Sequence, residues 1–98
     1  MSEKCFTLRV ITPEQEIFND RIVSVIVPGS EGQFCVLANH APLVSQLKKG
    51  VVLVEYADGK CIDVDVEGGY TKVRDNVVII LATSASMFTE PDITPSIN

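Results

Sequence analysis

Residue types that could act as a nucleophile and a base lie close together in the middle of the chain. His40 is the only histidine in the sequence, and Cys35 and Ser45 lie at nearby positions on either side of it. An imidazole beside a thiol or a hydroxyl can activate that group for attack on a substrate. This chemistry also needs a third group that orients the base, and the sequence offers no evident candidate. We therefore do not expect an enzyme; a base placed beside Cys35 or Ser45 would be needed to support one.

Carboxylates alternate along a later, strand-like stretch. Asp63, Asp65 and Glu67 occupy every second position, so a strand would place them on one face, about 7 Å apart. A cation site is one interpretation, but hard cations need oxygen ligands that converge from several directions. We favour a solvated outer face of a sheet and expect no metal site.

A glycine-flanked stretch, Gly29-Ser30-Glu31-Gly32, could be taken for a phosphate-binding loop. A P-loop also requires a lysine and a following helix, and neither is present here. Glu31 would in addition repel a phosphate group. We expect a turn between strands, serving either as a simple connection or as a contact loop.

This turn belongs to a longer irregular segment. Pro28 and the two glycines favour a turn, residues 34–37 form a short apolar strand-like run, and Asn39-His40-Ala41-Pro42 turns the chain again. Irregular backbone usually lies at the surface, on a rigid scaffold, where binding tends to occur. Both turns are therefore candidates for contact with a partner, and the alternative is a pair of purely structural turns.

Alternating or β-branched apolar stretches predict the strands that would position these turns. They cover residues 6–12, 16–20, 21–27, 51–56, 61–67, 70–74 and 77–81. Tight turns between strands are indicated by Asp58-Gly59, Gly68-Gly69 and Asp75-Asn76. About eight to ten short strands without helical periodicity indicate an all-β sandwich or barrel. We favour a two-sheet antiparallel β-sandwich with no C-terminal helical domain.

The strand pattern stops at Ala82, and the residues that follow contain two prolines. We expect the sandwich domain to cover residues 1–85. Residues 86–98 are expected to form an extended, docked or disordered tail.

The composition restricts the classes of partner. The chain has 98 residues and a formal net charge of −5, which fits one domain and argues against nucleic acid and anionic membrane surfaces as partners. No apolar run approaches the ~18 residues of a membrane span, and no signal or transit peptide is evident. The three cysteines are widely spaced and odd in number, so we expect reduced thiols in a cytoplasmic compartment.

Residues 27–50 resemble the signature of the epsilon subunit of rotary F-type ATP synthase. The resemblance rests on Gly29-Ser30-Glu31-Gly32, on Asn39-His40-Ala41-Pro42-Leu43 and on Leu47-Lys48-Lys49-Gly50. Further landmarks of the family are Thr12-Pro13-Glu14 and Gly68-Gly69, so the resemblance extends from about Phe6 to about Ala85. Three positions depart from the family pattern, with Cys35 in place of a glycine and Ala38 and Lys49 in place of prolines.

The resemblance implies a β-sandwich and a non-catalytic subunit of the central stalk. Such a subunit links the gamma subunit to the c-ring and couples proton translocation to ATP synthesis. By resemblance, the loop that faces the c-ring consists of Gly29, Ser30, Glu31, Gly32, Gln33 and Phe34. By resemblance too, the turn that faces the gamma subunit consists of Asn39, His40, Ala41 and Pro42.

The resemblance also implies that the chain needs no cofactor. Relatives that bind ATP do so with a C-terminal helical hairpin, which this sequence lacks, so we expect no nucleotide site. The proline-containing ending does not resemble the start of a truncated helix, which favours a naturally short chain over a cut one. The implied location is the cytoplasmic face of the bacterial inner membrane, as a peripheral subunit. The alternative from another class is a stand-alone β-sandwich module that binds a peptide or a glycan. The absence of tryptophan argues against glycan stacking.

Overall fold

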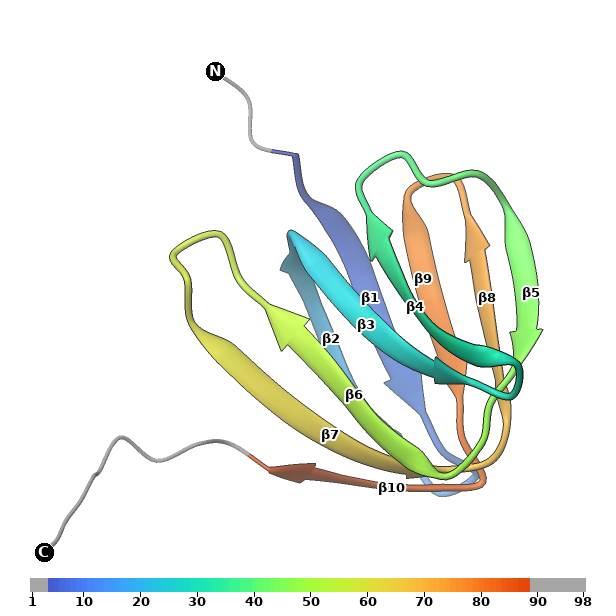
Figure 1. Ribbon diagram of the computed structural model, residues 1–98. Coiled ribbons are helices and arrows are strands. Elements are labelled where there is room, and N and C mark those ends of the chain that lie inside the picture. Colours follow the sequence, from blue (N-terminus) through green and yellow to red (C-terminus); the bar gives the residue numbers. More distant parts are fainter. Residues whose placement is uncertain (1–3, 89–98) are drawn as a thin grey trace, which may run out of the picture.

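Two five-stranded sheets pack face to face in the computed structural model, which describes residues 4–88 (Figure 1). The strands are β1 (Phe6–Ile11), β2 (Glu16–Ile22), β3 (Ser24–Gly29), β4 (Gly32–Leu37), β5 (Leu43–Gln46), β6 (Gly50–Glu55), β7 (Cys61–Glu67), β8 (Tyr70–Arg74), β9 (Val77–Leu81) and β10 (Ser84–Phe88). No helix occurs among residues 4–88. The all-β sandwich that the sequence predicts is thereby confirmed.

The chain crosses repeatedly between the two sheets. The first sheet has the strand order β2-β1-β9-β8-β5, and the second has the order β10-β7-β6-β3-β4. The ladder between β1 and β9 is parallel, whereas the other ladders of the described residues are antiparallel. A parallel pair needs a long connection, and here most of the chain lies between the two strands.

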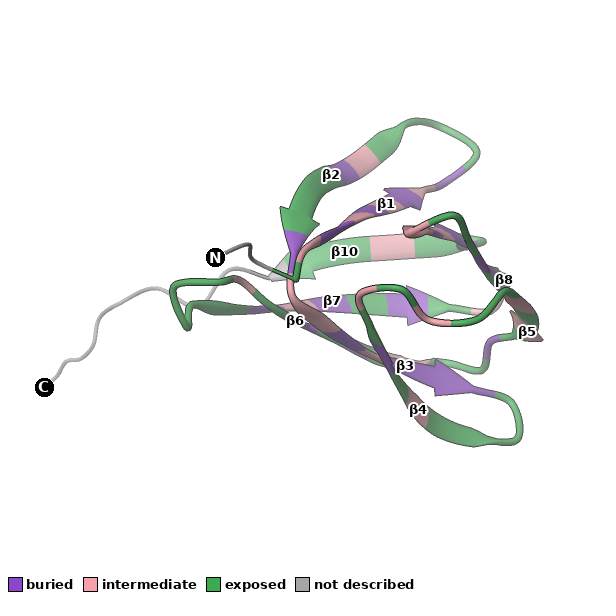
Figure 2. Cartoon of the chain, turned by 90° about the horizontal axis from the view of Figure 1, so that it is seen from above, coloured by how far each residue is buried: buried purple, intermediate pink, exposed green. Residues whose placement is uncertain are grey.

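The core lies between the sheets and is built from alternate residues of the strands (Figure 2). In β7, for example, Ile62, Val64 and Val66 are buried while Asp65 and Glu67 are exposed, as the alternation predicts. Burial of one such aliphatic side chain is worth about 1.5–3 kcal/mol. The largest fully buried side chains are Phe6, Leu8, Ile22, Ile80, Val10, Val25, Val27, Val36, Val52, Val54, Val64 and Val66.

The crossing from the first sheet to the second differs from the sequence-based expectation. We expected a strand break between Asp20 and Arg21, but both residues pair with β1, and the chain changes sheet at Val23. No glycine or proline marks this crossing. Ile22 and Val23 form an apolar, β-branched pair across this point, and the crossing is identified by the pairing partners and by the shift of the buried positions.

Strand β10 was not among the expected strands. It pairs antiparallel with β7, with Ser84 opposite Glu67 and Phe88 opposite Asp63, and forms an edge of the second sheet. It therefore extends past Ala85, the expected end of the sandwich. The remainder of the expected tail, residues 89–98, lies outside the described residues, and that part of the domain division stays a prediction.

Candidate partner-binding loops

The loop expected to face the c-ring forms the tip of the β3–β4 hairpin, at the lower right of Figure 1. Gly29 and Gly32 are paired across the hairpin, and Ser30 and Glu31 between them are exposed. Gly32 has a φ of 132°, a conformation that side chains rarely tolerate. A Cβ atom on Gly29 would lie 2.9 Å from the ring of Phe34. The two glycines are thus required for different reasons, one by its backbone angle and one by close packing.

Hydrogen bonds fix the tip of this hairpin to the end of β5 and to the connection that follows it. The Ser30 amide donates to the Gln46 carbonyl at 2.8 Å, and the Lys48 amide donates to the Pro28 carbonyl at 3.0 Å. Gly29 also forms a β-bridge with Leu47. These bonds lie outside the ladder of the hairpin and fix its tip at Pro28, Gly29 and Ser30. Glu31 projects from this fixed tip.

The turn expected to face the gamma subunit joins β4 to β5. Asn39 adopts a left-handed conformation with a φ of 65°, and the His40 amide donates to the Leu37 carbonyl at 3.2 Å. The His40 Nδ1 atom lies 2.7 Å from the Ala41 carbonyl oxygen, which can only accept, so we assign a proton to Nδ1. Ala41 and Pro42 are exposed.

A residue that the sequence marked only as part of a turn contacts this segment. Asn76, in the β8–β9 hairpin, accepts a hydrogen bond from the Asn39 amide at its Oδ1 atom, at 2.6 Å. The two residues are 37 positions apart. No local pattern in the sequence signals a contact over that separation.

The two expected contact loops lie at opposite ends of β4 (Figure 1). The strand has six residues, which separates the loops by about 20 Å at the usual rise per residue of a strand. Two different partners could therefore contact the chain at the same time.

Exposed apolar side chains lie on the outer face of the first sheet, with Tyr70 and Leu81 at the end of the sheet near the β3–β4 hairpin. Val44 is 68% exposed, Tyr70 53% and Leu81 49%. Tyr70 and Leu81 pair across β8 and β9, and Val44 on β5 pairs with Lys72, two positions along β8 from Tyr70. The three side chains thus share one face as cross-strand or diagonal neighbours. Clustered exposed apolar residues are typical of surfaces that bind another protein.

The nucleophile and base candidates make separate contacts. The His40 ring hydrogen-bonds to the Ala41 carbonyl, and the Ser45 hydroxyl donates to the Gln46 carbonyl at 3.3 Å. The Cys35 sulfur lies 3.8 Å from the hydroxyl oxygen of Ser24. None of these contacts links His40 to Cys35 or Ser45, so the geometry offers no nucleophile–base pair.

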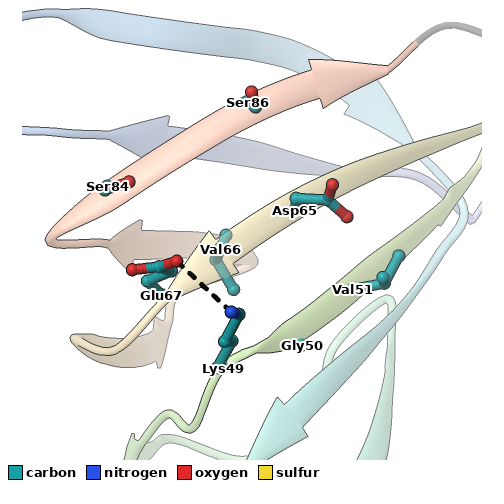
Figure 3. A pocket seen from close by; sticks show the side chains of 8 residues that line it. All are labelled: Lys49, Gly50, Val51, Asp65, Val66, Glu67, Ser84 and Ser86. Atoms are coloured by element: carbon teal, nitrogen blue, oxygen red, sulfur yellow. Dashed lines mark ion pairs between the residues drawn. The ribbon is translucent and has the colours of Figure 1, made fainter.

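The acidic stretch borders an open groove of about 440 Å³ at one end of the second sheet (Figure 3). Its lining residues are Lys49, Gly50, Val51, Asp65, Val66, Glu67, Ser84 and Ser86. The Lys49 Nζ atom lies 3.7 Å from a Glu67 carboxylate oxygen, and both side chains are largely exposed. Within residues 4–88 no group of three potential metal ligands comes together. The groove thus contains an exposed ion pair, which is worth at most about 1 kcal/mol.

Tyr56 connects the two sheets at the opposite end of the sandwich from the β3–β4 hairpin. Its hydroxyl donates to a carboxylate oxygen of Asp20 at 3.1 Å, and its ring lies 6.5 Å from that of Phe18. Partial burial, together with the Asp20 carboxylate, raises the pKa of the Tyr56 hydroxyl. The hydroxyl therefore keeps its proton at neutral pH and serves as a structural donor.

Comparison with known families identifies most of the chain. Residues 5–87 match the family "ATP synthase, Delta/Epsilon chain, beta-sandwich domain". An ATP synthase epsilon chain of Pelotomaculum thermopropionicum is 39% identical over 93 residues, which cover 95% of this chain and 69% of the relative. One of Campylobacter concisus is 46% identical over 78 residues, covering 80% of this chain and 60% of the relative. The matched region is thus 60% to 69% of the length of these two relatives.

Solved structures give the same fold. A chain from the Euglena gracilis mitochondrial ATP synthase, in a structure of the OSCP/F1/c-ring, superimposes with a TM-score of 0.81 at 28% identity. The match covers 89% of this chain and 56% of that chain. A chain from the central stalk and c-ring of the Tetrahymena thermophila mitochondrial ATP synthase has a TM-score of 0.69 at 14% identity, which supports the fold alone.

The described residues include no helix that is long and apolar enough to cross a membrane. The family match begins just before β1 and ends within β10, so it includes both candidate loops. A chain of this family is one subunit of a larger assembly rather than an enzyme by itself. On these grounds the chain belongs to the ATP synthase delta/epsilon chain family and contains its β-sandwich domain.

Proposed function

We propose that this chain links the gamma subunit to the c-ring in the central stalk of a proton-translocating ATP synthase. The observation that carries the proposal is the presence of two rigidly held loops at opposite ends of β4, in a chain of this family. One loop contacts the ring and the other contacts the gamma subunit. We further propose a peripheral location on the cytoplasmic face of a bacterial inner membrane.

At the c-ring end, the contact is made by residues 29–34. Glu31 is exposed at the hairpin tip, and no ion pair within residues 4–88 neutralises it. A basic side chain on a polar loop of the ring would complement this carboxylate. Such an exposed ion pair contributes little to affinity but favours one orientation of the hairpin on the ring.

At the gamma end, the contact is made by residues 39–42 and extends onto the outer face of the first sheet. The polar turn runs into β5, where Val44 is exposed two residues after Pro42, whereas Tyr70 and Leu81 lie at the other end of this sheet face, opposite Gln46. Apolar and aromatic side chains beside polar groups are the composition of a binding surface, in which buried aromatic residues supply much of the energy.

The mechanical role follows from the packing of the sandwich. The chain transmits torque between the ring and the gamma subunit, so that proton translocation is coupled to ATP synthesis at sites on other subunits. A close-packed interior deforms little under load. The hydrogen bonds that fix the tip of the β3–β4 hairpin extend this stiffness to the contact loop.

A pull-down of the purified gamma subunit from the same organism tests the proposal. We expect the wild type to bind and His40→Glu to lose binding, because the new carboxylate would be desolvated in the contact. Ser86→Glu is the matched control, since it adds the same charge on the outer face of the second sheet. Binding by His40→Glu would move the contact elsewhere on the sandwich. No binding by the wild type would overturn the gamma link.

A further inference from the structure

The side chain of Asn76 joins three segments that are distant in the sequence. Its Oδ1 atom accepts from the Asn39 amide at 2.6 Å, and its Nδ2 atom donates to the Cys5 carbonyl at 3.0 Å. Its own carbonyl accepts from the Thr7 amide at 3.2 Å. Asn76 thereby connects the β8–β9 hairpin to the start of β1 and to the Asn39–Pro42 turn.

The hydrogen bond between Asn76 and Asn39 connects the Asn39–Pro42 turn to a different part of the chain. The other described hydrogen bonds of the turn are local, since the His40 amide bonds to Leu37 and the His40 ring bonds to Ala41. Asn39 has a positive φ of 65°, a conformation that asparagine tolerates better than most residues but less readily than glycine. An acceptor fixed on a neighbouring hairpin stabilises one conformation of the turn.

We propose that Asn76 is a positioning residue for the gamma-binding turn. Its side-chain oxygen holds the Asn39 amide, so that residues 39–42 are in their binding conformation before the gamma subunit arrives. A preformed turn avoids the free energy of ordering a flexible one upon association. This inference rests on the proposed function, but the bond to Asn39 can be tested without any partner.

Asparagine meets three requirements at position 76. The backbone is left-handed, with a φ of 64°, and asparagine tolerates this conformation better than most residues. The side chain must also offer an acceptor to Asn39 and a donor to Cys5, and the asparagine amide supplies them from two separate atoms of one planar group. Glycine keeps the backbone conformation and loses both bonds. Aspartate keeps the acceptor but brings a carboxylate towards the Cys5 carbonyl.

The experiment compares Asn76→Gly with Asp75→Gly, a matched control in the same hairpin. Asp75 also has a positive φ, of 53°, and its carboxylate lies 3.5 Å from the exposed Arg74 side chain rather than near the turn. Hydrogen exchange of the Asn39 amide is measured by NMR, and affinity for the purified gamma subunit is measured in parallel. Exchange of the Val64 amide, in the central part of β7, reports whether the fold remains intact.

We expect Asn76→Gly to accelerate exchange at Asn39 and to weaken gamma binding, each by about tenfold, the equivalent of one lost hydrogen bond. Asp75→Gly should change the exchange rate at Asn39 and the affinity for the gamma subunit by no more than about twofold. The Val64 amide should remain protected from exchange in both variants. Asn76→Asp should retain most of the protection at Asn39, because it keeps the acceptor.

Unchanged exchange at Asn39 in Asn76→Gly would overturn the inference, whatever the gamma subunit does. Faster exchange with wild-type gamma affinity would also overturn it, because the bond would then be structural only. Faster exchange at Asn39, with no gamma binding even by the wild type, would support the role of Asn76 in fixing the turn. That result would refute the proposed function instead.

Discussion

Gly69 lies where the chain crosses from β7 in the second sheet to β8 in the first. Its φ is 107°, and a Cβ atom built on it would lie 1.9 Å from the Leu81 carbonyl oxygen. Two independent constraints therefore exclude a side chain, one from the backbone angle and one from the approach of β9. The sequence predicts a turn at this position, but the second constraint depends on which strand lies opposite.

Gly69→Ala should reduce the free energy of unfolding by about 3–5 kcal/mol, the sum of backbone strain and steric overlap. The measurement is urea denaturation followed by far-ultraviolet circular dichroism. Gly59→Ala is the control, because Gly59 has a φ of 91° but no atom within 4 Å of the added Cβ. It should lose only about 1–2 kcal/mol, from strain alone. Equal losses in the two variants would show that the approach of β9 has no energetic weight.

Asn76 illustrates what sequence reasoning could not find at the residue scale. The Asp75-Asn76 pair predicts a tight hairpin, and both residues do have positive φ angles. The bond to Asn39 spans 37 positions and joins a hairpin of the first sheet to the end of a strand of the second. Turn chemistry is local and can be predicted from the sequence, whereas the partner of a turn side chain depends on the packing of the whole sandwich.

At the scale of elements, alternation of apolar and polar residues predicts the strands that have one buried face, such as β7. It fails for β10, because Ser84, Ala85 and Ser86 carry little contrast in polarity. That strand forms through pairing with β7. The crossing at Val23 is missed for another reason: the buried positions shift there from Phe18 and Ile22 to Val25 and Val27, but no glycine or proline marks the change.

The bond between Tyr56 and Asp20 connects β2 of the first sheet to the end of β6 in the second. Because the pKa of Tyr56 is raised above that of the unfolded chain, this group stabilises the fold below pH ~10. The contribution is lost as the pH rises through the folded pKa. The wild type should therefore lose stability more steeply than Tyr56→Phe above pH ~10. Urea denaturation at pH values from neutral to about 11 measures the difference. If the free energy of unfolding had the same pH dependence in the two proteins, the result would contradict a raised pKa of Tyr56.

At the scale of the whole molecule, the position of the two contact loops relative to each other is the feature that gives the sandwich a mechanical use. The sequence predicts both turns and the strand run between them. It does not predict that the end of β5 and the residues after it fix the tip of the β3–β4 hairpin through Gln46, Leu47 and Lys48. That anchoring depends on the order of the strands in two different sheets, and it converts a hairpin tip into a rigid contact point.

The c-ring contact leads to a prediction about salt. Glu31→Lys should weaken binding of the chain to purified c-ring, by about fivefold or less, because an exposed ion pair is worth at most about 1 kcal/mol. The difference from the wild type should vanish near 1 M salt, where the screening length falls to about 3 Å. Glu55→Lys, an exposed residue at the far end of the second sheet, makes the same charge change and should bind as the wild type does. If both variants lose affinity equally, the effect reflects net charge, and the hairpin tip is not the contact.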